Sequence, residues 1–289
     1  MSNVLRTLRA SLSFALANPK MLAGIAILAV LLLFSFVGPM FVDLRNAEPI
    51  SVSTNQRPSA ELWLGSDSGG RDLLAVMIAA TPQTLRMGVL AGALGVAFGV
   101  FLGLVAGYWG GWRDRVISTV TDTMLTIPPL AILLVVAASM RSITVEIMAV
   151  IIAALSWMFA ARIIRAQVLS LREQNYVKMA KLSGMSDLRV VLTEVLPNIV
   201  PLAFAAFVGA VSGAILAGIG LEVLGLGPQN TPTLGMTIYW ALLYSAFSRG
   251  MWWWWLPPIL ILIALFISLF LITAALDEVA NPKLRRSRK

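Results

Sequence analysis

The stretch YVKMAKLSGMSDLRVVLTEVLP, residues Tyr176–Pro197, is a charge-dense segment that separates two long apolar ones. Gly184 divides it into two halves, each of which permits a helix. The second half repeats apolar residues at the spacing of one helical face: Leu188, Val191, Leu192 and Val195. We expect a helix–Gly–helix element that serves as a docking surface, with a solvated connector as the alternative. Its water-facing sides carry cations: Lys178, Lys181 and Arg189.

The composition of the chain indicates a multi-pass membrane protein, and the apolar runs described below make its expected fold all-α. Of its 289 residues, 58% are hydrophobic and 12% are charged, whereas soluble proteins contain about 25% charged residues. So few charges could not cover the surface of a soluble globule. The absence of Cys and His excludes thiol nucleophiles, disulfides, imidazole acid–base catalysis and the usual zinc sites.

Six apolar runs predict helices that cross the hydrocarbon core, which is about 30 Å thick. They cover roughly residues 21–42, 87–112, 116–140, 147–161, 198–221 and 250–276. Pro128 and Pro129 are expected to kink or break the third span. Residues 234–247 form a further apolar run that is short for a span, and we expect a re-entrant or surface helix there.

The distribution of basic residues predicts the orientation of the spans. With six spans, sixteen of the 22 Lys and Arg residues fall on the side of both termini and five fall on the other side. Because cytoplasmic loops carry the excess of cations, both termini and the Tyr176–Pro197 segment are expected to be cytoplasmic. Most of the net charge of +8 is therefore explained by basic residues that orient the membrane helices, and nucleic-acid binding is not expected.

This topology divides the chain into five parts. They are a cytoplasmic N-terminal segment (1–20), the first transmembrane helix (21–42), an extracytoplasmic loop (43–83), a transmembrane core (84–276) and a basic cytoplasmic tail (277–289). The core includes the cytoplasmic loop 166–197, which lies between the fourth and fifth spans.

No catalytic motif is visible: there is no Gly-rich phosphate loop, no HExxH, no GxSxG and no paired-carboxylate arrangement. Asp122 is the only acid clearly inside a predicted span, and an intramembrane carboxylate is a candidate functional group. It lies seven residues after Arg115, about two helical turns from the cytoplasmic edge. Asp122 is therefore either a salt-bridged residue near the interface or part of a transport path.

Two predicted spans carry small residues at three- and four-residue spacing, which allows close helix contact in lipid. In the second span these are Gly88, Gly92, Gly95, Gly99, Gly103 and Gly107, and in the fifth they are Gly209, Gly213, Ala217 and Gly220. Such faces also suit pairing with a second copy or a homologous subunit. Trp252–Trp255 begins the sixth span and is expected to be an interfacial anchor, with stacking on a sugar substrate as the alternative.

The Tyr176–Pro197 segment resembles the cytoplasmic coupling loop of ABC-importer permeases, in which Glu-Ala-Ala-x-x-x-Gly precedes a Leu-Pro pair. Ala180, Gly184 and Leu196-Pro197 match this pattern, whereas Lys178 and Met179 replace the Glu and the first Ala. Most of the chain resembles the second permease of peptide/nickel-type importers, through stretches that are specific jointly: Trp63–Asp67, Gly70–Asp72, Ala106–Trp112, Ser156-Trp157, Ala161-Arg162, Ser170–Glu173, Leu224–Gly227 and Asn281-Pro282. Members of that family often carry Glu at the position of Gly218, whereas this chain has Glu222 one helical turn later.

The resemblance implies a non-catalytic permease subunit in the cell membrane, which forms half of the pathway for peptides or similar small solutes. Its implied partners are a homologous second permease, two ABC ATPase subunits, an extracytoplasmic substrate-binding protein and the lipid bilayer. ATP and Mg²⁺ would be bound by the ATPases, and no cofactor by this chain. An ion-coupled secondary transporter or a membrane-embedded enzyme acting alone are the alternatives.

The resemblance also implies site residues. ATPase coupling is expected from Tyr176, Val177, Lys178, Met179, Ala180, Lys181, Gly184, Met185 and Pro197. Asp122 and Glu222 are candidates for the pathway or a subunit interface. Dipeptides, oligopeptides, glutathione, nickel chelates and oligosaccharides all remain as substrate classes of such importers.

Overall fold

The computed structural model describes residues 18–280, and within this range every regular element is helical. The long helices are α2 (Pro19–Val37), α3 (Leu73–Trp109), α6 (Val145–Arg172), α9 (Leu196–Val223) and α11 (Trp252–Ala280). The shorter ones are α4 (Gly111–Thr126), α5 (Pro129–Ala138), α7 (Asn175–Leu182), α8 (Asp187–Val190) and α10 (Leu234–Leu243). Two 3₁₀ turns, Gly38–Met40 and Leu44–Ala47, and a π turn, Val191–Val195, complete the set. The predicted N-terminal segment and basic tail lie almost entirely outside the described residues.

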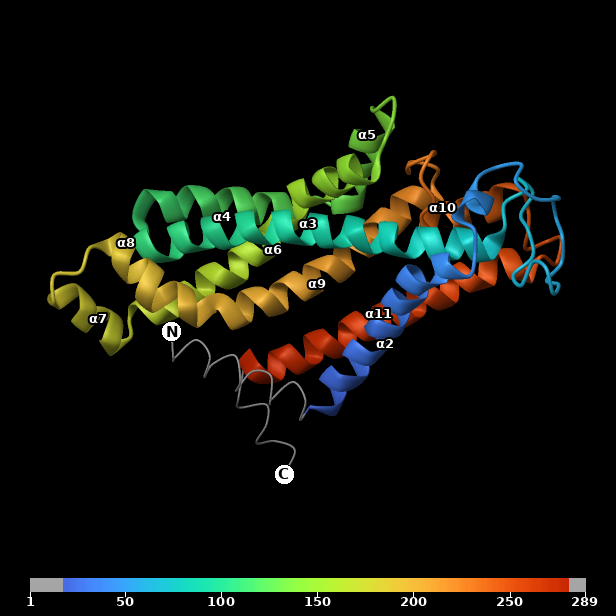
Figure 1. Ribbon diagram of the computed structural model, residues 1–289. Helices are drawn as coiled ribbons and strands as arrows, with labels where there is room; N and C mark the ends of the chain where they lie inside the picture. Colours follow the sequence, from blue (N-terminus) through green and yellow to red (C-terminus); the bar gives the residue numbers. More distant parts are fainter. Residues whose placement is uncertain (1–17, 281–289) are drawn as a thin grey trace.

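The helices form an elongated bundle whose two ends differ (Figure 1). Helix α3 runs along most of its length and packs most extensively on α6, and α9 packs on both. Helices α2 and α11 form a second packed pair, which Lys20 and Glu278 join through an ion pair of 2.6 Å. Helices α7 and α8 lie at one end of the bundle, and the loop between α2 and α3 lies at the other.

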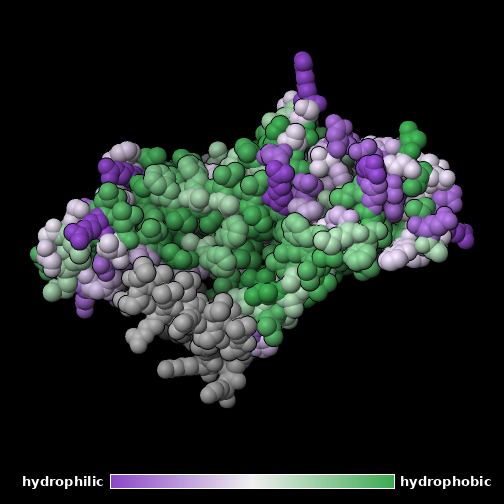
Figure 2. All heavy atoms as spheres, in the orientation of Figure 1, coloured by the Kyte–Doolittle hydropathy of each residue, from purple (hydrophilic) through white to green (hydrophobic). Residues whose placement is uncertain are grey.

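The bundle has the length and polarity of a multi-pass membrane protein. Among residues 18–280, five helical stretches are long and apolar enough to cross a membrane, or six if α4 and α5 count as one span. The axes of α4 and α5 differ by 81° at the Pro128–Pro129 break, so the predicted interruption is confirmed. Apolar side chains cover the middle of the bundle and polar ones gather towards its two ends (Figure 2).

Helix α3 begins at Leu73, so residues 73–83, which were predicted to belong to the external loop, are helical. The Asp72 carboxylate starts the helix because it accepts a hydrogen bond of 2.9 Å from the Leu74 amide. Arg86 therefore lies inside a helix, where it pairs with Glu146 of α6 at 2.7 Å. The charge-free run therefore missed the first part of α3, and α6 likewise extends beyond its predicted end to Arg172.

The glycine face of α3 packs against helices of the same chain. A Cβ atom at Gly99 would lie 2.6 Å from the Trp157 carbonyl oxygen of α6, and one at Gly103 would lie 2.8 Å from the Ala161 carbonyl oxygen. The other glycines of this face meet α6 or α9 as closely: Gly88, Gly92, Gly95 and Gly107. Close helix packing is confirmed here, and this face leaves no room for a second copy or a homologous subunit.

The tryptophan run at the start of α11 is only partly exposed. Trp253 and Trp254 are 6% and 1% exposed, whereas Trp252 is 51% exposed. The Trp253 indole N–H donates to the Ser66 carbonyl oxygen at 3.4 Å. An interfacial role is therefore wrong for Trp253 and Trp254, because the folded loop between α2 and α3 and the end of α10 cover them.

Helix α10 is too short to span a membrane and is held against the bundle by its first turn. The Leu234 amide donates to the Thr84 hydroxyl of α3 at 3.0 Å, and Leu234 and Met236 are buried. Thr233 caps the helix through the Met236 amide. The run 234–247 is thus one short docked helix followed by a turn.

Candidate functional site

The predicted coupling residues lie on α7, near the turn that follows it and, in the case of Pro197, in the first turn of α9. Most of their side chains are exposed to solvent, whereas Ala180 and Met185 are partly buried and Val177 is fully buried. Gly184 has φ +83°, with open space around the position of a Cβ atom. It makes the reversal between α7 and α8 in a conformation that a side chain would strain. The helix–Gly–helix prediction is confirmed. The exposed members are Tyr176, Lys178, Met179, Lys181, Gly184 and Pro197.

Val177 anchors α7 to the transmembrane helices. Its side chain belongs to one buried cluster with residues of α3, α6, α8, the π turn and α9: Tyr108, Ile164, Val168, Val190, Val191, Val195 and Ile199. Burial of a Val side chain contributes about 1.5–3 kcal/mol. Helix α7 is therefore attached to the ends of three long helices rather than suspended on a flexible loop.

A polar cluster adds a second attachment. The Tyr108 hydroxyl at the end of α3 donates to the Asp187 carboxylate at 2.9 Å. The Lys181 ammonium of α7 lies 3.1 Å from the same carboxylate and 4.7 Å from the centre of the Tyr108 ring. The hydrogen bond to Asp187 raises the pKa of Lys181. We call these three residues the coupling clamp. Lys181 was among the predicted coupling residues, whereas Tyr108 was noted only as part of a turn motif and Asp187 was not assigned to any site.

Further polar contacts fix the helix ends around the clamp. Arg165 of α6 pairs with Asp114 of α4, with 2.8 Å between Nη2 and Oδ2. Arg172 at the end of α6 donates to the Gly107 carbonyl oxygen at 3.2 Å. On α7 itself, Lys178 lies 3.1 Å from the Glu173 carboxylate, and this hydrogen bond lowers the pKa of Glu173.

The predicted apolar face of the second half is only half buried. Val191 and Val195 are buried, whereas Leu188 and Leu192 are 61% and 52% exposed. The cause is the π turn, in which the Leu196 amide donates to the Val191 carbonyl oxygen. This wider turn shifts the preceding residues around the helix axis. The helix then continues to Val223, with Pro197 in its first turn.

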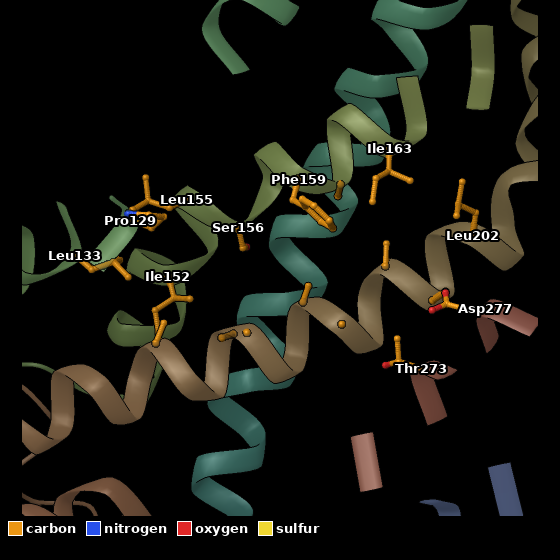
Figure 3. Close-up of a pocket in the computed structure, with 18 residues that line it drawn as sticks. Pro129, Leu133, Ile152, Leu155, Ser156, Phe159, Ile163, Leu202, Thr273 and Asp277 are labelled. Carbon is orange, nitrogen blue, oxygen red and sulfur yellow. The ribbon is translucent and has the colours of Figure 1, made fainter. Parts of the chain in front are cut away.

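A cavity of about 550 Å³ lies among α5, α6 and α9, with the end of α11 at one side (Figure 3). Gly209 and Gly213 of α9 line it, and the position of a Cβ atom at either has nothing within 4 Å. Its few polar lining residues are Ser156 of α6 and Thr273 and Asp277 of α11. Asp277 was assigned to the tail from its sequence. Its position directly after the last apolar run was the one feature of the sequence that could have indicated a place beside the cavity.

Neither predicted pathway acid lines this cavity. Asp122 pairs with Arg162 of α6 beside a smaller cavity of about 150 Å³, and both side chains are more than half exposed. Glu222 is fully buried near the end of α9, where it lies against Gly235 and Gly227. Within residues 18–280, no group of three or more acidic side chains could hold a metal ion.

The stretches Trp63–Asp67 and Gly70–Asp72 build the loop between α2 and α3. The Asp67 carboxylate accepts hydrogen bonds from the amides of Gly69 and Arg71 at 2.8 and 2.9 Å, and burial raises the pKa of Asp67. The Ser66 hydroxyl accepts from the Gln56 amide at 2.8 Å. Ser66 and Asp67 therefore stabilise the fold of the loop.

Known transport proteins are similar to this chain. Residues 99–286 match the family described as "binding-protein-dependent transport system inner membrane component". The dipeptide transport system permease protein DppC of Alkalihalophilus pseudofirmus is 32% identical over 213 residues, which cover 73% of this chain and 69% of the relative. The oligopeptide transport system permease protein OppC of Lactococcus lactis subsp. lactis is 28% identical over 268 residues, which cover 91% of this chain and 90% of the relative. The glutathione transport system permease protein GsiD of Pectobacterium atrosepticum is 32% identical over 175 residues, which cover 61% of this chain and 58% of the relative.

Proposed function

The chain belongs to the binding-protein-dependent transport system inner membrane components, and we propose that it forms half of the pathway of an ATP-driven (ABC) importer for peptides or similar small solutes. Its relatives are named as permeases for dipeptides, oligopeptides and glutathione. Such permeases are non-catalytic subunits, which depend on ATPase and substrate-binding partners. The proposed assembly contains a homologous second permease, two ATPase subunits that bind ATP and Mg²⁺, and one extracytoplasmic binding protein.

The proposed orientation places α7 and both termini in the cytoplasm, with α4 and α5 together as the third of six spans. The charge asymmetry supports this arrangement, since Lys and Arg concentrate on the side that contains α7. The loop between α2 and α3 then faces the opposite compartment, where a binding protein would deliver its solute.

One observation carries the proposed mechanism: α7 is joined to the ends of α3, α6 and α9 by the Val177 cluster and by the coupling clamp. A force on the exposed side of α7 would therefore move several helix ends as one unit. ATP on the partner subunits supplies the difference in affinity between two states that any such shift requires. The result would be alternating access to the cavity.

The cavity among α5, α6 and α9 supports the proposed path for the solute. Its α9 wall consists mainly of Ala and Gly, which leaves room for a passing solute or for the second permease. Because the lining is mostly apolar, it would bind solutes weakly and without strong selection. We therefore assign most of the selectivity to the binding protein.

Substitution of Gly184 tests the proposal. Gly184→Val forces a β-branched residue to φ +83°, at a cost of about 1–2 kcal/mol, and should misplace α7 against the ATPase. In proteoliposomes containing the complete importer, solute uptake should fall by about tenfold, the factor that corresponds to 1.4 kcal/mol, while ATP hydrolysis continues.

Gly250→Val is the matched control, because Gly250 also has a positive φ (+68°) and open space but lies just before α11 at the other end of the bundle. Equal uptake by both variants would contradict the coupling role of α7. Co-purification without any ATPase subunit, with uptake that survives ATP depletion, would refute the importer function itself.

A further inference from the structure

Ile50 has an unusual backbone conformation in the loop between α2 and α3. Its φ is +64°, a region that β-branched residues avoid because their Cβ atom meets the following carbonyl group. Only two other non-glycine residues in the described range have a positive φ, Asn55 and Ser245. Asn commonly adopts this conformation, so Ile50 is the residue that needs an explanation.

The surrounding loop holds Ile50 in this conformation. Its amide donates to the Gly69 carbonyl oxygen at 2.9 Å, and the amides of Ser51 and Val52 donate to the Gly70 carbonyl oxygen at 2.9 and 3.0 Å. The strain is therefore built into a hydrogen-bonded loop and is not a feature of a frayed segment.

Packing within the chain does not compensate for this strain. The Ile50 side chain is 91% exposed, so it contributes almost no buried apolar area to the fold. Its neighbours Glu48 and Ser51 are exposed as well, and charged or polar neighbours exclude a position in the hydrocarbon core. The reason for an isoleucine must then lie outside the chain.

Trp63, on the same loop, is presented in a similar way. It is 71% exposed, yet its indole N–H donates to the Ala60 carbonyl oxygen at 3.2 Å. A tryptophan that anchors a protein in the membrane interface uses its N–H towards water or lipid headgroups. Because the N–H of Trp63 is already satisfied within the loop, only its apolar ring is offered to a partner.

We propose that Ile50 and Trp63 are the apolar contacts through which this permease receives its extracytoplasmic binding protein. The inference rests on the proposed function and identifies the partner's chemistry: a soluble protein with apolar pockets. The loop lies at the opposite end of the bundle from α7 (Figure 1), which is the side of the binding protein in the proposed orientation. Rigidly presented apolar side chains on a polar loop match the anchor residues that dominate protein interfaces.

The test compares stability with recognition. Ile50→Gly and Ile50→Asn remove the strain, and Trp63→Ala removes the ring. In the reconstituted importer, the purified extracytoplasmic binding protein of the same system is titrated while ATP hydrolysis is followed. The concentration that gives half-maximal stimulation should rise at least fivefold for each variant. The melting temperature of the purified Ile50→Gly complex should be equal to or higher than that of the wild type.

Phe41→Ala is the matched control, since Phe41 is 80% exposed at the membrane end of the same loop and should titrate like the wild type. Unchanged titration by the Ile50 and Trp63 variants would overturn the inference. It would also be overturned if these variants titrate normally but have a lower melting temperature or no longer bind the second permease. These results leave the proposed function intact. If the binding protein fails to stimulate even the wild-type importer, the proposed function fails instead.

Discussion

Helices α3 and α9 both carry glycines at three- and four-residue spacing, yet the structure uses the two faces differently. On α3, every glycine from Gly88 to Gly107 meets another helix of the same chain within close contact distance. On α9, Gly209 and Gly213 have no atom within 4 Å of a Cβ position and line the cavity. The same sequence pattern thus forms a rigid core in one helix and an open wall in the other.

The difference separates structural glycines from glycines that keep a space free. The α3–α6 contact holds the two helix backbones so close together that no side chain fits between them. The α9 face leaves volume that a solute or a second permease can occupy. Substitutions on the α3 face should therefore lower the stability of the protein, whereas substitutions on the α9 face should reduce solute uptake.

Gly99→Val should have the largest effect. Its Cβ atom would lie 2.6 Å from the Trp157 carbonyl oxygen, and the α6 backbone cannot move away without separating from α3. Overpacking of this kind costs about 1–3 kcal/mol or more, so folded protein in detergent should be reduced strongly. Gly209→Val is the control on α9, and the comparison fails if both variants melt at the same temperature.

Gly213→Leu should leave folding intact but impair transport. The added side chain enters the cavity, where nothing lies within 4 Å of the Cβ position. We expect a melting temperature close to that of the wild type and about a tenfold loss of uptake in proteoliposomes, equivalent to about 1.4 kcal/mol. Gly213→Ala should transport much better than Gly213→Leu. Normal uptake by the leucine variant would show that the open face of α9 has no role in transport.

Tyr108→Phe should have an intermediate effect, because it removes one hydrogen bond of the coupling clamp where the rigid α3–α6 body meets α7. The hydroxyl donates to a carboxylate at 2.9 Å, and such a bond contributes about 1.5 kcal/mol. The number of solutes transported per ATP hydrolysed should fall, with insertion unchanged. Tyr244→Phe serves as control, since its hydroxyl has no hydrogen bond within residues 18–280. A normal ratio for Tyr108→Phe would remove the clamp from the mechanism.

Lys178→Glu should have the smallest effect on the subunit itself. Lys178 is exposed and its pair with Glu173 lies on the surface, where ion pairs contribute about 0–1 kcal/mol. If Lys178 meets an acidic patch on the ATPase, charge reversal should weaken assembly at low salt and less so at high salt. Pull-down of the ATPase at two ionic strengths measures this, and assembly equal to the wild type would rule out the acidic patch.

Much of the fold could be predicted from local chemistry. The Pro128–Pro129 break, the reversal at Gly184 and the apolar spans depend on backbone restrictions and hydropathy that single residues carry. Helix ends were less accurate, because Asp72 and Arg86 extend α3 into a segment whose charges suggested a loop. The coupling residues were found through a resemblance, whereas Asp277 and the clamp partner Asp187 were not assigned to any site.

The amino-acid sequence by itself determined that this protein is a helical membrane protein and where its chain reverses. Only the tertiary structure decided which apolar faces meet protein and which remain open. The physical reason is that lipid is as apolar as a protein core, so hydropathy and spacing cannot distinguish the two surroundings. Hence Trp253 and Trp254 are buried where an interfacial anchor was expected, and two similar glycine faces became a packed core and a cavity wall.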